Sequence, residues 1–302
     1  MSAHTRVLLD ASPSLGSLYA KAAGARLTAQ FPGSKPAGGA LPEVEHHLEG
    51  LQVDAAKLVA YQRLMGDTVR DELPSVFVHG MVFPLAMSVM VREDFPLPLL
   101  GMVHLANQVT HLRPISPGAM LWATARAVNL REHRAGTQLD LVVEAGEGAD
   151  VVWRGASTYL ARGVWPGARP SAPAAPRPPR DNPERTASWR LAADTGRAYA
   201  AVLGDYNPIH LSAASARALG MNRAIAHGMY LAGRALASAA PHGVGYDWGI
   251  EFATPVFLPS SVDVAIRVGE RETTFSGWGA RSGKPHFSGS VAAHGKVPPA
   301  GD

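Results

Sequence analysis

The pattern of hydrophobic and polar residues predicts helices and β-strands that occur in the same order twice along the chain. In each half a short strand pattern comes first, from Val44 and from Ser188, helical patterns follow, and four strand patterns with turn residues between them come last. The predicted strands are residues 102–112, 119–130, 137–144 and 151–161 in the first half, and 248–256, 261–270, 273–281 and 286–294 in the second. This order indicates an α+β fold made of two copies of one unit, each a helix wrapped by an antiparallel sheet.

Two strongly apolar stretches are expected to form the central helices of these units. Residues 73–91 are nineteen residues without Asp, Glu, Lys or Arg, but Pro74, Gly80 and Pro84 interrupt them, so a buried helix is favoured over a membrane span. The second stretch is MYLAGRALASAA, which follows His227 and Gly228.

Individual residues also repeat between the halves. A tyrosine stands six residues before an aspartate in both, at Asp67 and at Asp205, and the tripeptide His-Gly-Met begins at His79 and again at His227. From the aspartate to the tripeptide there are twelve residues in the first half and twenty-two in the second. Glu72 stands where a histidine would complete the first copy, so we expect the first half to keep the scaffold and lack a catalytic loop.

The second half carries the strongest candidate for chemistry. Asp205 and His210 are five residues apart with Asn207-Pro208 between them, and proline ends a helix here, so both side chains are expected on one bent loop. Ser212 is placed to cap a short helix after the loop. We expect Asn207 to orient the loop and Asp205 and His210 to converge on one small site.

The helix that begins at Gly228 offers a third group. The N–H groups in a first helical turn have no intrahelical acceptor, and glycine leaves them open to approach, so this N–H can polarise a carbonyl oxygen. We expect His227 to cap or support this helix and Tyr199 to support the site from the core. Asp205, His210 and His227 would also suit zinc or iron, but the role expected for His227 at the start of its helix argues against a metal site.

The elements Tyr199, GDxNPxH from Gly204 to His210, and His227-Gly228-Met229 together resemble the signature of the MaoC-like, or hydratase-2, family. The resemblance implies a double hot-dog fold, a reaction on acyl thioesters and no cofactor. It also implies that Asp205 and His210 hold the catalytic water and that the Gly228 N–H binds the thioester oxygen. The first half, by the same resemblance, leaves room for a bulky acyl chain.

Composition and the positions of proline and glycine set the expected domain boundaries. Ser12-Pro13 can start a helix in residues 1–43, and its apolar side is expected to dock on the body of the protein. That side carries Leu15, Leu18, Tyr19 and Ala22. We expect a degenerate hot-dog domain at 44–163, a Pro/Arg-rich linker at 164–185, a catalytic domain at 186–296 and a tail at 297–302.

Charge and cysteine content exclude several classes of protein. Residues 162–190, which include the linker, contain six arginines against two acidic residues, so the basic excess of the chain lies there, which argues against a nucleic-acid-binding face. The chain has no cysteine, so disulfides and thiolate chemistry are excluded, and a cytoplasmic location is expected.

The expected function is (R)-specific hydration of 2-enoyl thioesters, or the reverse dehydration of 3-hydroxyacyl thioesters, carried by coenzyme A or acyl carrier protein. The alternatives are a hot-dog thioesterase, which has no need of the NPxH segment, and a non-catalytic acyl-thioester-binding protein. Asp205 and His210 are intact, which argues against the latter. A monomeric double hot-dog or a homodimer of it is expected, and acyl chain length is left open.

Overall fold

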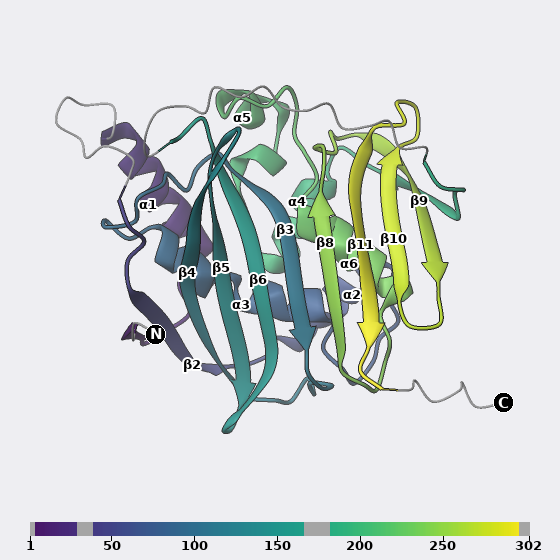
Figure 1. Cartoon of the computed structure of the whole chain (residues 1–302), viewed down its shortest axis with the longest axis horizontal. Helices are drawn as coiled ribbons and strands as arrows, with labels where there is room; N and C mark the ends of the chain where they lie inside the picture. Colours follow the sequence, from purple (N-terminus) through teal and green to yellow (C-terminus); the bar gives the residue numbers. More distant parts are fainter. Residues whose placement is uncertain (1–3, 29–38, 166–181, 296–302) are drawn as a thin grey trace.

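The computed structural model describes residues 4–28, 39–165 and 182–295. Most of the predicted linker and the whole predicted tail lie outside these residues. Within them the strands form one eleven-stranded sheet, in the order β1-β2-β4-β5-β6-β3-β8-β11-β10-β9-β7 (Figure 1). The first-half strands are β1 Thr5–Leu9, β2 Val44–Leu51, β3 Met102–His111, β4 Leu121–His133, β5 Gly136–Glu147 and β6 Asp150–Arg162. The second-half strands are β7 Ala187–Leu191, β8 Tyr246–Phe252, β9 Ser260–Val268, β10 Thr273–Gly279 and β11 Pro285–Ala293.

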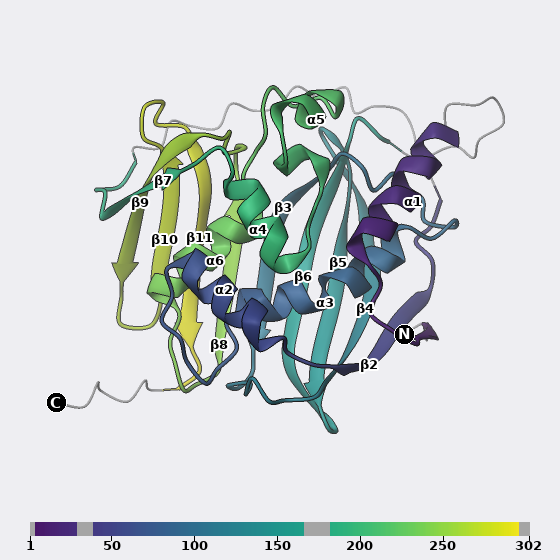
Figure 2. The same cartoon turned by 180° about the vertical axis from the view of Figure 1, so that it is seen from behind.

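The two halves join where β3 pairs with β8 in antiparallel register, with Val109 opposite Trp248. This pairing covers two strand edges that would otherwise be open to other chains. Figure 2 shows the helices gathered on one face of the sheet. They are α1 Leu15–Thr28, α2 Ala55–Met65, α3 Ser75–Met90, α4 Thr195–Leu203, the 3₁₀ turn η1 Pro208–His210, α5 Ala213–Ala218 and α6 Gly228–Ala239. The architecture is therefore the double hot-dog that the sequence predicts.

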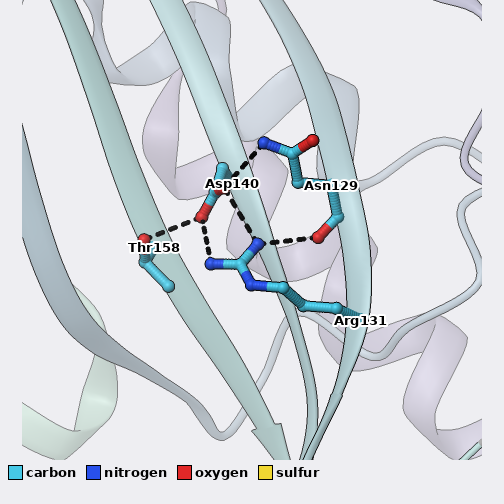
Figure 3. A network of polar contacts seen from close by, with 4 residues as sticks. All are labelled: Asn129, Arg131, Asp140 and Thr158. Atoms are coloured by element: carbon cyan, nitrogen blue, oxygen red, sulfur yellow. Dashed lines mark hydrogen bonds and ion pairs between the residues drawn. The ribbon is translucent and has the colours of Figure 1, made fainter.

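The core lies between the sheet and the central helices α3 and α6. Alternation along β5 shows this directly, because Leu139 and Leu141 are buried while Asp140 points to the opposite face. There Asp140 accepts hydrogen bonds from Asn129, Arg131 and Thr158 on the two neighbouring strands (Figure 3). The outer face is thus polar around Asp140, whereas Leu139 and Leu141 face the helices on the other side of the sheet.

Two details differ from the expectations. Strand β1 was not predicted; it pairs in parallel with β2 at the sheet edge, and such pairing is invisible to local pattern. The two His-Gly-Met tripeptides do not occupy equivalent places, because α6 begins at Gly228 whereas Gly80 lies inside α3. As expected, the first half lacks the segment that forms η1 and α5 in the second half.

Among the described residues, no helix is both long enough and apolar enough to cross a membrane. The apolar stretch at 73–91 is instead the buried helix α3, as its prolines and glycine indicate.

Candidate active site

A cavity of about 430 Å³ opens between the two halves and collects the predicted site residues. From the second half it is lined by Tyr199, Asp205, Asn207, His210, His227 and Gly228. From the first half its walls include Phe83, Met87, Met90, Leu99, Met102 and Leu160. The cavity therefore has a polar part beside the GDxNPxH segment, residues 204–210, which we call the motif loop, and an apolar part beside α3.

Local sequence explains the shape of the motif loop. Helix α4 ends at Gly204, whose φ of 81° lies in the left-handed region that favours glycine. Asn207 then begins the turn η1, with its side chain accepting from the Ile209 N–H at 3.4 Å. Ser212 caps α5 by accepting from the Ser215 N–H at 3.1 Å. These caps hold a bent segment on which Asp205 and His210 face one site.

Asp205, His210 and His227 form a close cluster. The rings of His210 and His227 are stacked with centroids 3.6 Å apart. His227 Nε2 bonds to the Asp205 backbone carbonyl at 3.0 Å and lies 3.7 Å from its Oδ2 atom. His227 is the N-cap residue of α6, but its side chain caps no helical N–H. It links the start of α6 to the motif loop instead.

The hydrogen bonds of His210 define its tautomer. Its Nδ1 lies 2.8 Å from the Ile225 carbonyl oxygen, which can only accept, so Nδ1 carries the proton and Nε2 presents a lone pair. Burial, reinforced by the neighbouring His227, lowers the pKa of His210 to about 3. His210 is therefore a neutral hydrogen-bond acceptor throughout the neutral pH range.

Asp205 is kept ionised. Burial opposes its ionisation, but the neighbouring His227 and the hydrogen bonds donated by the Tyr19 hydroxyl and the Asn207 N–H favour the charged form, and the pKa of its carboxyl lies below the ordinary value. The site thus pairs a carboxylate with a neutral imidazole, two acceptors that can hold the two hydrogens of one water molecule.

The N-terminus of α6 lies at the same cavity. Gly228 is its first residue, and the N–H at that position has no intrahelical acceptor. A Cβ atom on Gly228 would lie 2.7 Å from the ring of Phe252, so the close approach of that ring requires glycine. An oxygen bound here would meet an N–H and the positive end of the helix dipole.

Tyr199 and Asn207 support this geometry. The Tyr199 ring is 3% exposed and its centroid lies 4.7 Å from that of His227, so it packs against the cluster from α4. The Asn207 backbone N–H donates to Asp205 Oδ1 at 3.3 Å.

The same cluster is the one group in the described chain with donor atoms arranged to hold a metal ion. The donor atoms of Asp205, His210 and His227 lie within 4.8 Å of one another. The two imidazole rings are stacked, and each uses one nitrogen on a backbone carbonyl, which leaves its other nitrogen as an acceptor. These atoms could therefore accept from one water molecule or bind one ion.

Several cavity residues were not anticipated from the sequence. The predicted strand at 102–112 contains His104, whose side chain also lines the cavity, as do those of His79 and His286. Consecutive strand residues normally face opposite sides, yet His104 and Leu105 both line the cavity because β3 has a bulge at this point. A bulge depends on strand pairing, so no local pattern reveals it.

The corresponding place in the first half is closed. Asp67 pairs with Arg70, with Nη1 and Oδ1 3.4 Å apart, and the hollow beside them has a volume of only about 30 Å³. Arg70 also lies 2.9 Å from His242. We call this cluster of Asp67, Arg70 and His242 the vestigial site.

Comparison with known proteins agrees with this geometry. Residues 172–280 match the MaoC-like domain family. The chain is 33% identical over 273 residues to 3-hydroxyacyl-thioester dehydratase X of Mycobacterium tuberculosis, covering 85% of this chain and 95% of that protein. The crystal structure of HtdX from the same organism superposes with a TM-score of 0.72 at 30% identity, covering 83% of this chain and all of that one. A MaoC-like dehydratase from Phytophthora capsici shares the fold, with a TM-score of 0.64 at 17% identity and coverage of 84% of this chain and 96% of that one. The chain belongs to the MaoC-like domain family.

Proposed function

We propose that this chain is a 3-hydroxyacyl-thioester dehydratase that interconverts (3R)-hydroxyacyl and trans-2-enoyl thioesters. One observation carries the proposal: an ionised carboxylate and a neutral imidazole acceptor stand together beside a free helix N-terminus in a cavity with an apolar extension. The printed name of the relative from Mycobacterium tuberculosis supports the reaction class. The (R) configuration is what the family resemblance implies.

In the hydration direction, Asp205 and His210 hold one water molecule above C3 of the enoyl group. The water oxygen forms a bond to C3 while one of its protons passes to the pair. The electrons of the C2–C3 double bond move toward the thioester oxygen, and the Gly228 N–H stabilises the developing negative charge. The pair then returns the proton to C2, so water is added without a net gain or loss of protons. Dehydration follows the same steps in reverse.

Rough magnitudes fit an enzymatic rate. A positioned acid–base pair contributes ~10²–10⁴-fold, and a preorganised oxyanion donor about 3–4 kcal/mol. Because Asp205 and His210 act on one water molecule, we expect them to titrate and to respond to mutation as a unit.

The acyl chain is proposed to run into the first half. Phe83, Met87 and Met90 on α3 line the cavity, and methionine side chains adapt readily to different chain lengths. Arg134 and Arg162 also border it and would suit the phosphates of a coenzyme A or acyl carrier protein thioester. The absence of cysteine is consistent with action in the cytoplasm.

Turnover of crotonyl- and dodecenoyl-coenzyme A tests the proposal. We expect loss of the absorbance of the conjugated double bond without release of free thiol. Thiol release without hydration would assign the chain to the hydrolases. Stable binding of both coenzyme A and acyl carrier protein thioesters without turnover would identify a binding protein.

Matched substitutions then locate the chemistry. We expect Asp205→Asn and His210→Gln each to lower kcat by ~10²–10⁴-fold with the fold intact. Asp67→Asn is the control, because Asp67 occupies the vestigial site and should be nearly silent. Equal losses from Asp67→Asn and Asp205→Asn would contradict the assignment of one catalytic half.

A further inference from the structure

The carboxylate of Asp205 has a partner far outside the motif. The hydroxyl of Tyr19 donates to Asp205 Oδ1 at 2.5 Å, across 186 positions of sequence. Tyr19 lies on α1, which precedes the segment that matches the MaoC-like domain family, residues 172–280. The motif therefore contains no information about this contact, although the contact reaches its central residue.

Helix α1 is held in a defined place by its apolar side. Leu15, Leu18 and Ala22 are buried, and α1 packs on α3 on the helix-covered face of the sheet (Figure 2). Leu15 also reaches the motif loop, since its Cδ1 lies 3.5 Å from where a Cβ on Gly204 would stand. Helix α1 therefore places Tyr19 against Asp205 and Leu15 against Gly204, the residue that precedes Asp205.

The two oxygens of the Asp205 carboxylate have different partners. Oδ1 accepts from the Tyr19 hydroxyl and from the Asn207 backbone N–H. Oδ2 makes no hydrogen bond to the described residues and lies 3.7 Å from His227 Nε2. With Oδ1 occupied by two protein donors, Oδ2 is the oxygen left to accept from a water molecule or substrate hydroxyl.

We propose that Tyr19 is a positioning residue for the dehydratase reaction: its hydroxyl fixes Asp205 through Oδ1, so that Oδ2 is presented to the water shared with His210. The proposal rests on the function proposed above. Burial and the neighbouring Asp205 raise the pKa of Tyr19 well above its ordinary value, so the hydroxyl keeps the proton that it donates.

Removing this donor has a predictable electrostatic sign. A hydrogen bond to the charged form of a carboxyl lowers its pKa, and the Tyr19 hydroxyl acts on Asp205 in this direction. Without it, Asp205 becomes protonated at a higher pH. The other titratable groups that interact with Asp205 are His79, His104, Tyr159, Tyr199, His210 and His227.

The decisive variant is Tyr19→Phe, which keeps the ring that packs with α1 and removes only the hydroxyl. Tyr206→Phe is the matched control, because Tyr206 adjoins Asp205 in sequence but is 49% exposed and lies outside the cavity lining. Three sets of measurements are made for each variant: steady-state kinetics with dodecenoyl-coenzyme A, which give kcat and KM; the pH profile of kcat/KM; and the urea midpoint of unfolding.

For Tyr19→Phe we expect kcat to fall ~10–100-fold, the loss typical of a hydrogen bond to a charged group, with KM changed by less than about twofold. We also expect the acid limb of the pH profile to move toward neutral pH. The urea midpoint should fall only slightly, because Oδ1 keeps the Asn207 N–H as a donor. Tyr206→Phe should match the wild type in all three. A Tyr19→Phe enzyme with the wild-type pH profile overturns the proposal, whether its activity is unchanged or falls with its stability.

Failure of the proposed function can be distinguished from failure of this inference. A wild-type protein that does not turn over enoyl thioesters refutes the function alone. Difference-infrared titration of the Asp205 carboxyl in the wild type and in Tyr19→Phe then decides the contact. A carboxyl that protonates at a higher pH in the variant supports it, and identical titrations reject it.

Discussion

The neutral state of His210 leads to a sharp prediction for activity at mildly acidic pH. The perturbation is a change from pH 7.5 to pH 5.0. With a pKa of about 3, lowered by burial and by His227, His210 stays ~99% neutral at pH 5.0. An ordinary histidine, with a pKa of ~6.5, would be only ~3% neutral at that pH.

Asp205 adds no titration in the same interval. The pKa of its carboxyl lies below the ordinary value, so it too remains in its working state at pH 5.0. We therefore expect kcat/KM, which reports the free enzyme, to be nearly the same at pH 5.0 and pH 7.5. At pH 5.0 a histidine with the ordinary pKa would leave kcat/KM about 30-fold lower than His210 with a pKa of about 3, which is a difference that initial rates detect easily.

The assay is the initial rate of hydration of crotonyl-coenzyme A, followed by the absorbance of its conjugated double bond at subsaturating substrate. Circular dichroism at pH 5.0, and recovery of the rate on return to pH 7.5, control for unfolding. A reversible fall with a midpoint near pH 6.5 would refute the reasoning, because it would mean that His210 is solvated and titrates as a free imidazole.

Three further substitutions test other parts of the structure. Met90→Phe should shorten the acyl chain that the cavity accepts. Displacing two methylene groups costs ~1.6 kcal/mol, so kcat/KM should fall about 15-fold for dodecenoyl-coenzyme A and stay unchanged for crotonyl-coenzyme A. The control is Met120→Phe, because the Met120 side chain is 59% exposed. Equal losses for both substrates would reject the tunnel. Gly196→Ala should lower kcat at least about tenfold, since a Cβ there would stand 2.1 Å from the His210 carbonyl oxygen and would displace that residue; wild-type kcat would mean that the loop moves without penalty. Asp140→Asn should cost about 1–2 kcal/mol of unfolding free energy at pH 7 in urea titrations. Because the folded-state pKa of Asp140 is lowered, this difference should vanish as the pH falls through that value, and a difference that persists in acid would contradict the ionic origin.

The fold was largely predictable because its elements are encoded locally. Alternating apolar residues specify the strands, and Gly204, Pro208 and Ser212 shape the motif loop through backbone preferences that act within a few residues. Asp205 and His210 are close in sequence and share that loop, so their convergence could be anticipated as well.

What could not be predicted depends on contacts between distant segments. Tyr19 was placed on the docking side of its helix, but nothing near it in the sequence indicates that it reaches Asp205. The bulge that brings His104 to the cavity arises from the pairing of β3 with β6. The His-Gly-Met tripeptide at His79 suggests a helix start like that at His227. In the structure, however, α3 begins at Ser75, four residues before His79, because helix boundaries depend on the residues around the tripeptide as well.

The vestigial site has a consequence for how substrate preference can change. In a dimer of identical hot-dog subunits, every substitution appears twice, so one that reshapes an acyl-binding wall also alters the matching surface beside the other catalytic loop. Here the halves are joined in one chain, and Arg70 fills the place of a second site. A substitution at Met87 or Met90 therefore changes only the acyl-binding wall and leaves the catalytic loop as it was. Selection, or a protein engineer, can tune the wall of the first half while the catalytic loop of the second half stays unchanged.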